Sequence, residues 1–587
     1  MTNGFKFVAL AAVTSFALTS CVDDNYDLSD LDKTMQFQVR DLVVPVNLDE
    51  IELRNILHPS ENSTIKEIDG QYVVMESGKI SSDEISIDRQ LITPAPIKPT
   101  VRDIAQIDDP IADASERIEA YDLTDITGDF DYEKTDIPEE IQSLRHVDVD
   151  WTMTIKVDIS DPQKIFRKME YTDVVLTLPK GLDTENTDYD PETGLLNVGR
   201  ITPPAGATSF SLDLDVTGID FSKQGADEFT FTPGADGGKG TIKFTGSVGV
   251  ASGHALITMD LAPNLHPATV TMTMTPVMGD MLIKAFSGKV KYTFSNFNVP
   301  SVSIHDLPDL LADEETDIIL SNPQLYLSVN NPMAGYGLDT KADINLVPVR
   351  NGVDSDPLKL NPGEFIVIGT DRGTTGPYRF CVSPERPDSY YEGYDDASQV
   401  YATDFSYLLS GEGMPKTIKV KVPTAAATGE VNDFQLGVNM GKVDGDYTFY
   451  CPLALSTGSK IVYSDTIDGW NSGTVDRIVI TSLTLMTDID NELPFDVTLS
   501  GYPLTAGGEQ AVDPETGKPV YIKPVTVPAN SVTPITTTTD GTVTRLDGIH
   551  FVATANVVTD DQVLETTTGI KLQKIRVKVS GTYTDTF

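Results

Sequence analysis

The chain has 587 residues, and its 88 Asp and Glu against 43 Lys and Arg give a formal net charge of −45. So acidic a chain is a poor candidate for nucleic-acid binding, which needs a basic surface. Hydrophobic residues make up 40 % of the chain, which is enough for sizeable cores and argues against general disorder.

The N-terminal residues 1–20 read as a secretory signal peptide. Lys6 supplies the positive charge, and the apolar run from Val8 to Leu18 is shorter than the 20 or so residues that span a bilayer. The run ends in Leu18-Thr19-Ser20-Cys21, which resembles a bacterial lipobox. This resemblance implies that Cys21 carries acyl chains such as palmitate. Because no other stretch reaches 18 apolar residues, we expect lipid to be the only attachment to the membrane. The alternative is an ordinary secreted protein in which Cys21 is incidental.

An acidic tether is predicted at residues 21–35. Asp23 and Asp24 follow Cys21 closely, and further Asp residues follow these. The run resembles the export signal of Bacteroides-type surface lipoproteins, which implies an outer-membrane location facing the cell exterior. The alternative is a solvated tether without a sorting role.

Residues 36–145 form a mixed region in this interpretation. It holds a Pro-rich stretch at 94–99, and the spacing of its isoleucines predicts one short helix near 110–121. A further turn of helix is expected around Leu307–Leu311.

The rest of the chain is dominated by alternating patterns. From Trp151 to Ile159 apolar and polar residues alternate strictly, which is typical of a half-buried strand, and similar patterns recur to the C-terminus. We therefore predict an all-β protein of tandem antiparallel β-sandwich domains with little helix. The predicted sandwiches span residues 146–298, 299–480 and 481–587.

Two of these segments share a weak internal repeat. Around Asn331-Pro332 and again around Asn491 and Pro494, an alternating strand stops at Asn and Pro and a second alternating strand follows. This unit resembles the β-sandwich of the water-stress, late-embryogenesis-abundant proteins.

Motifs for catalysis or metal binding are scarce. The six His are scattered singly, and 88 carboxylates are too many to single out a catalytic pair. No cofactor is expected, although one acidic loop could hold Ca²⁺ through oxygen ligands; its members are Asp183, Glu185, Asp188 and Asp190. Cys381 and Cys451 could pair in an oxidising compartment, or remain as two buried free thiols.

The segment 388–407 is the best candidate for ligand binding. Tyr390, Tyr391 and Tyr394 stand among carboxylates, a composition suited to sugar binding and to protein interfaces. The alternative is a loop whose rings cover the edge of a sandwich.

These features favour a non-enzymatic, lipid-anchored protein that presents a binding or structural surface outside the outer membrane. Its expected partners are the membrane, through the lipid alone, and a glycan or a protein. The alternatives are an extracellular glycan-directed hydrolase with unrecognised acidic catalysts, and a subunit of a larger envelope assembly.

Overall fold

The computed structural model of the chain describes residues 34–44, 63–107, 115–223, 228–261, 266–294, 296–305, 311, 313–360, 366–369, 376–411, 413–470 and 475–586. The predicted signal peptide, Cys21 and most of the predicted acidic tether lie outside the described residues. The all-β prediction is confirmed, because 63 % of the structure is strand and its sheets are antiparallel almost throughout. Helix in the described part of the chain is limited to short 3₁₀ turns and the single α-helical residue Leu311.

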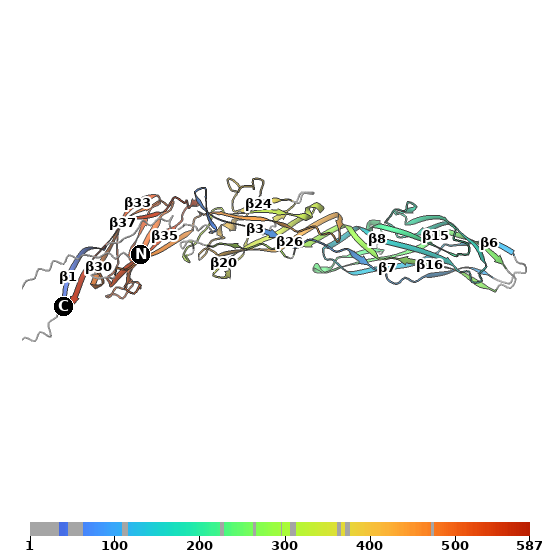
Figure 1. The fold of residues 1–587 in the computed structure, drawn as a ribbon, viewed down its shortest axis with the longest axis horizontal. Helices are drawn as coiled ribbons and strands as arrows, with labels where there is room; N and C mark the ends of the chain where they lie inside the picture. The colour runs from blue at the N-terminus through green and yellow to red at the C-terminus, as the bar shows by residue number, and fades with distance from the viewer. Residues whose placement is uncertain are drawn as a thin grey trace, which may run out of the picture.

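Three sandwiches lie in line and form a rod (Figure 1). We name them proximal, middle and distal by their distance from the chain ends. The chain runs out along the rod and back, so that strands near both ends of the sequence meet in the proximal sandwich. There the edge strand β1 (Thr34–Val44) pairs with β37 (Ile570–Thr586), and Thr34 lies opposite Thr586.

The proximal sandwich contains two sheets, one built around β37 and one around β35. Its elements, besides β1 and β37, are β29 (Lys460–Ile467), η6 (Val475–Arg477), β30 (Ile478–Asn491), β31 (Val497–Thr505), β32 (Ile522–Val527), β33 (Ser531–Thr538), β34 (Val543–Thr544) and β35 (Leu546–Asn556).

The middle sandwich packs a six-stranded sheet, which includes the outgoing strand β3, against part of a thirteen-stranded sheet. Its elements are β2 (Ile65–Ile68), β3 (Gln71–Ser81), β18 (Val302–Ser303), β19 (Gln324–Asn330), η4 (Pro332–Tyr336), β20 (Asp339–Arg350), β21 (Val353–Asp354), β22 (Leu358–Lys359), β23 (Ile366–Ile368), β24 (Tyr378–Ser383), β25 (Ser398–Tyr401), η5 (Thr403–Tyr407), β26 (Thr417–Gln435) and β27 (Asp444–Pro452).

The distal sandwich packs the remainder of the thirteen-stranded sheet against a seven-stranded one. Its elements are β4 (Gln90–Ile92), β5 (Thr100–Ile107), β6 (Ser115–Asp122), β7 (Ile126–Ile137), β8 (Ile141–Ile159), β9 (Phe166–Thr177), β10 (Leu182–Thr184), β11 (Tyr189–Asp190), β12 (Leu195–Ile201), β13 (Ser209–Asp220), η2 (Phe221–Lys223), β14 (Phe229–Thr232), η3 (Ala235–Gly237), β15 (Gly240–Leu261), β16 (Ala268–Met278) and β17 (Met281–Thr293).

The predicted segments 146–298, 299–480 and 481–587 supply most strands of the distal, middle and proximal sandwiches, in that order. The region 36–145, taken from the sequence as one mixed unit, is shared among all three: β1 joins the proximal sandwich, β2 and β3 the middle one, and β4 to β7 the distal one.

The expected helix near 110–121 is wrong over its described part, because residues 115–122 form strand β6. This strand pairs antiparallel with β15, so the ladder supplies the backbone partners that a helix would have found internally. Ile118, one of the isoleucines behind the helix prediction, is 66 % exposed and covers no core. Residues 307–310 of the other expected turn lie outside the described residues.

Both junctions of the rod are made of strands. β17 pairs with β8 of the distal sandwich and with β26 of the middle one, so a single sheet runs from one to the other. At the proximal junction β28 (Ala454–Leu455) pairs with β36 (Gln562–Val563). One apolar core extends through the middle and distal sandwiches, and the proximal sandwich has a second. Because hydrogen-bonded ladders and packed cores resist bending, we expect the rod to be stiff.

The internal repeat has a common structural basis. The side-chain oxygens of Asn331 and Asn491, both fully buried, accept hydrogen bonds from the backbone N–H two residues later. Each side-chain NH₂ donates to carbonyls farther along, reaching Ile368 in one copy and Val527 in the other. The buried Asn therefore ties the chain reversal to a distant segment in both sandwiches.

The distal sandwich has a related reversal at Asp161-Pro162, between β8 and β9. The Asp161 carboxylate accepts hydrogen bonds from the backbone N–H of Ile165 and of Phe166, both at 2.9 Å. Each sandwich thus reverses its chain around one Asn or Asp that a proline follows within three positions.

Candidate functional site

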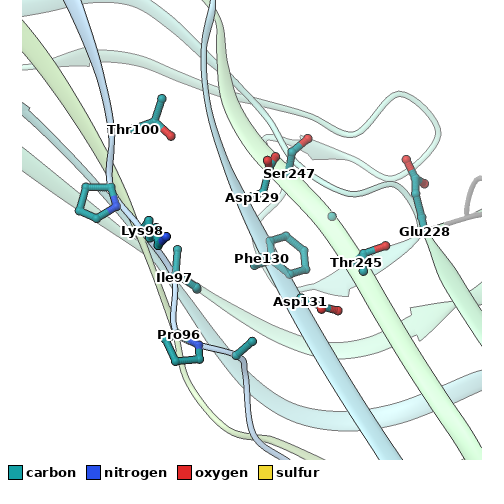
Figure 2. Close-up of a pocket in the computed structure, with 13 residues that line it drawn as sticks. Pro96, Ile97, Lys98, Thr100, Asp129, Phe130, Asp131, Glu228, Thr245 and Ser247 are labelled. Atoms are coloured by element: carbon teal, nitrogen blue, oxygen red, sulfur yellow. The ribbon is translucent and has the colours of Figure 1, made fainter.

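An open cleft of about 710 Å³ lies on the distal sandwich. Figure 2 shows its two sides, the segment 95–100 on one and strands β7 and β15 with Glu228 on the other. Its volume falls in the range usual for small-ligand sites. The lining residues are Ala95, Pro96, Ile97, Lys98, Pro99, Thr100, Asp129, Phe130, Asp131, Glu228, Thr245, Gly246 and Ser247.

The alternation of β7 places two carboxylates on the same side of the strand. Asp129 and Asp131 point away from the core, and Phe130 between them is buried in it. On β15 the residues opposite Asp129 and Asp131 are Ser247 and Thr245. Two carboxylates and two hydroxyls therefore stand side by side in the cleft.

A glycine lets the sheet close beneath the cleft. A Cβ atom on Gly246 would stand 2.4 Å from the Phe130 ring, so only glycine allows this ring to lie over β15. Phe130 also packs against Trp151 and Phe244 in the distal core. The carboxylates are thereby held on a rigid strand rather than on a loop.

The Pro-rich stretch forms the opposite wall. The N–H of Ala95 donates to the carbonyl of Asp131 at 2.7 Å, which attaches the start of the stretch to the edge of β7. Pro96 and Pro99 have no N–H with which to continue this pairing, so the chain leaves β7 and crosses to the other sheet. The cleft opens where the Pro-rich stretch and β7 separate.

The cleft offers mainly hydrogen-bond acceptors, with one amine. One carboxylate oxygen of Asp131 is buried without a hydrogen-bond partner in the protein, so this group has unused acceptor capacity. A ligand rich in O–H or N–H donors, such as a sugar, complements this lining. The Cα atoms of alternate strand residues are about 6.6–6.8 Å apart, so the backbone spacing of Asp129 and Asp131 lies near the lower end of the carboxyl separations used by inverting glycoside hydrolases.

Sequence reasoning missed this cleft. Asp129 and Asp131 did not stand out among 88 acidic residues, and the Pro-rich stretch that faces them lies about 30 positions earlier. The one usable signal was the Asp-Phe-Asp alternation at 129–131, which marks a half-buried strand with acids on its outer face.

The tyrosine segment lies on the middle sandwich and its rings pack against the sheet. Tyr394 is 9 % exposed and clusters with Tyr326 of β19 and Cys381 of β24, whereas Tyr390 and Tyr391 are half-buried. The N–H of Tyr391 donates to the Tyr326 hydroxyl at 3.0 Å. This geometry favours the alternative in which the rings cover the sheet; ligand binding by the segment stays a prediction.

Burial changes the acidity of three tyrosine hydroxyls in and around the ring cluster. It raises the pKa of the Tyr326, Tyr394 and Tyr450 hydroxyls above their ordinary value near 10, because a phenolate would lose its hydration there. These three hydroxyls therefore stay protonated at a pH at which an exposed tyrosine ionises.

The four calcium candidates make separate local contacts. Asp183 lies 2.6 Å from the His146 ring, and Asp190 accepts hydrogen bonds from Glu192 and Thr193 in its own turn. Over the described ranges, no three His, Cys, Asp or Glu side chains are grouped to hold a metal ion. The structure thus does not bring Asp183, Glu185, Asp188 and Asp190 together as one ligand set.

The disulfide alternative is wrong, because both Cys381 and Cys451 are free and buried. Strand β19 lies between their strands, β24 and β27, so they stand at least two strand spacings apart, about 9.6 Å, and they are also displaced along the strands. Cys381 belongs to the tyrosine cluster, and Cys451 to the main core on the other face of the sheet. Burial raises the pKa of both thiols.

Comparison with known proteins assigns no family. No protein-family model matches the chain, and no curated protein matches it. One solved structure, described as a "putative secreted protein from Parabacteroides distasonis", is similar with 12 % identity and a TM-score of 0.33 over 51 % of this chain and 90 % of the other. A score this low supports no conclusion about this protein. The lipoprotein and water-stress resemblances therefore stay predictions.

Within the part of the chain that the structure describes, no helix is long and apolar enough to cross a membrane.

Proposed function

We propose that this protein is a non-enzymatic lipoprotein of the outer membrane that holds its distal sandwich, with the cleft of Figure 2, away from the cell surface. The observation that carries the proposal is the pairing of β1 with β37 at the proximal end of the rod. Acyl chains on Cys21 would anchor the rod at that end, and the distal sandwich would point outward.

The length of the tether supports this arrangement. Thr34 lies thirteen positions after Cys21, and a fully extended chain of that length spans at most about 45 Å. The proximal sandwich would therefore stay near the membrane. The net charge of −45 would also keep the rod from lying flat on anionic headgroups.

The anchor is tested by Cys21→Ser, which should release the protein from membranes or block its maturation. Metabolic labelling with a palmitate analogue should mark the wild type alone; a labelled Ser variant would overturn the assignment.

Surface exposure is tested by epitopes placed in two exposed turns, the distal 235–237 turn and the proximal 514–517 turn. On intact cells antibody should reach both epitopes, and the double variant Asp23→Ala, Asp24→Ala should lose both signals while staying in the membrane fraction. Equal labelling of wild type and double variant would favour a tether without a sorting role.

A glycan-directed hydrolase is the second candidate, and the spacing of Asp129 and Asp131 is the observation that favours it. The two functions separate in one assay. If the cleft only binds, wild type and Asp129→Asn should release no reducing ends from a panel of polysaccharides. Release by wild type that Asp129→Asn abolishes would establish the enzyme.

A further inference from the structure

Strand β6 is an edge strand at the far end of the rod (Figure 1). Among the described residues it pairs with β15 alone, so its other edge presents unpaired backbone N–H and C=O groups. From Glu116 to Asp122 every residue is exposed or half-exposed, on both faces of the strand. Such an edge is open to a strand from another molecule.

The sequence of β6 is complementary to itself. If two copies pair antiparallel with Ile118 opposite Ile118, then Arg117 of each copy stands opposite Glu119 of the other. Residues directly opposite in an antiparallel pair share a face, so both contacts join unlike charges. The central Ile118, 66 % exposed in one copy, would be covered by its equivalent.

In the single molecule these charges have local partners. Arg117 forms an ion pair with Glu119 two positions along the same face. The Arg117 side chain keeps 60 % of its surface exposed, so it can turn to a cross-strand carboxylate without leaving a buried charge behind. The two copies together exchange two intramolecular pairs for two cross-strand pairs, and this exchange needs no change in the fold.

We propose that β6 joins two copies of this protein through a symmetric antiparallel pairing centred on Ile118. A two-fold axis through that residue makes the contact isologous, so that it closes on two molecules and does not propagate.

The orientation of β6 decides what such a pair would do. The strands of the distal sandwich run along the rod, β15 among them (Figure 1), and β6 pairs with β15. Antiparallel pairing therefore places the two rods end to end with their proximal sandwiches pointing apart. If the anchor is as proposed above, the pair would link two opposing membrane surfaces; this consequence, unlike the pairing itself, rests on the proposed function.

The contact is short, so we expect a weak dimer in solution. Seven or eight residues per strand bury less area than a standard stable interface. Many copies on one surface would strengthen it through multivalency.

Sedimentation analysis of the chain from residue 22 onward tests the pairing. We expect the dimer fraction of the wild type to rise with concentration. Arg117→Glu and Glu119→Arg should each remain monomeric, because each places like charges opposite each other twice. An equimolar mixture of the two variants should restore the dimer, since every cross-strand pair is then unlike. Ile118→Lys should abolish the dimer, and the matched control Val101→Lys, at another exposed apolar residue of the distal sandwich, should leave it intact.

Unchanged melting temperatures would show that the variants fold. A wild type that stays monomeric at every concentration would overturn the proposal and identify the charges of β6 as protection against pairing. A dimer that Arg117→Glu leaves intact would place the contact elsewhere.

The surface-bridging consequence is tested separately. Vesicles that carry the wild type on a common N-terminal tag should aggregate, and a mixture of vesicles carrying Arg117→Glu and Glu119→Arg should aggregate while neither population does so alone. Because the tag replaces the lipid, failure of the Cys21 anchor would leave both measurements unchanged.

Discussion

The tyrosine segment of the middle sandwich and the acidic cleft of the distal sandwich contrast sharply. The first combines rings and carboxylates within a few positions of sequence, and the structure turns its rings onto the sheet. The second combines residues from separate segments, and the structure leaves its carboxylates open. The contrast shows that a composition suited to binding also suits the cover of a sheet, and that the direction in which side chains point decides between them.

The largest effect on stability should follow from removing Tyr394, the best-buried ring of the tyrosine segment. Tyr394→Ala leaves a cavity against Tyr326 and should lower the free energy of unfolding by about 3–5 kcal/mol, the usual range for a buried aromatic. Urea denaturation measures this loss, and Tyr390→Ala, at a half-buried ring, serves as the milder control. A change below 1 kcal/mol would reopen the segment as a binding site.

Thiol labelling should sharpen the same contrast. In the folded wild type both Cys381 and Cys451 should resist a maleimide, because both are buried. Tyr394→Ala should speed labelling of Cys381, which shares its cluster, by at least tenfold and leave Cys451 protected on the other face. Equal acceleration at both thiols would indicate global loosening rather than loss of a cover.

Alkaline pH should lower the free energy of unfolding through the buried hydroxyl of Tyr394 in the tyrosine segment. Burial raises the pKa of Tyr394 in the folded state, so the unfolded chain ionises first. The stability that this group contributes is complete below pH 10 and is lost as the pH rises from 10 through the raised pKa. Urea titrations at pH 8 and 10.5 should show a smaller loss for Tyr394→Phe than for the wild type. A loss of the same size in both proteins would show that Tyr394 does not cause the loss of stability at alkaline pH.

The smallest effect on stability should come from the cleft. Asp129→Asn changes an exposed carboxylate and should alter the free energy of unfolding by less than about 0.5 kcal/mol. If the cleft binds donor-rich ligands, the same variant should lose signals on a glycan array that Tyr390→Ala keeps. Loss of the same signals in both variants would contradict the view that the cleft binds the ligand and the tyrosine segment does not.

The sequence was informative where its pattern is local. Strict alternation from Trp151 to Ile159 identified a strand that the structure confirms as part of β8, and the repeat at Asn331 and Asn491 identified a real equivalence. Relations between distant segments were beyond its reach. The sequence of residues 34–44 does not indicate that they pair with β37. The sequence of residues 94–100 does not indicate that they face Asp129 across the cleft. The helix near 110–121 failed for the same reason, because pairing with β15 overrode the local spacing of isoleucines.

The out-and-back course of the chain also sets an order of assembly. The distal sandwich is built from one continuous stretch, β4 to β17, and needs no later residue to complete its sheets except at the junction with β26. The proximal sandwich cannot close until β37, the last of the described strands, has been synthesised and has paired with β1, the first of them. Contacts between the ends of a chain form slowly. We therefore infer that the distal sandwich folds first and the proximal sandwich last. A truncation that removes only residues 570–587 should therefore leave β1 unpaired and the proximal sandwich open, while the tip at the other end of the rod stays folded.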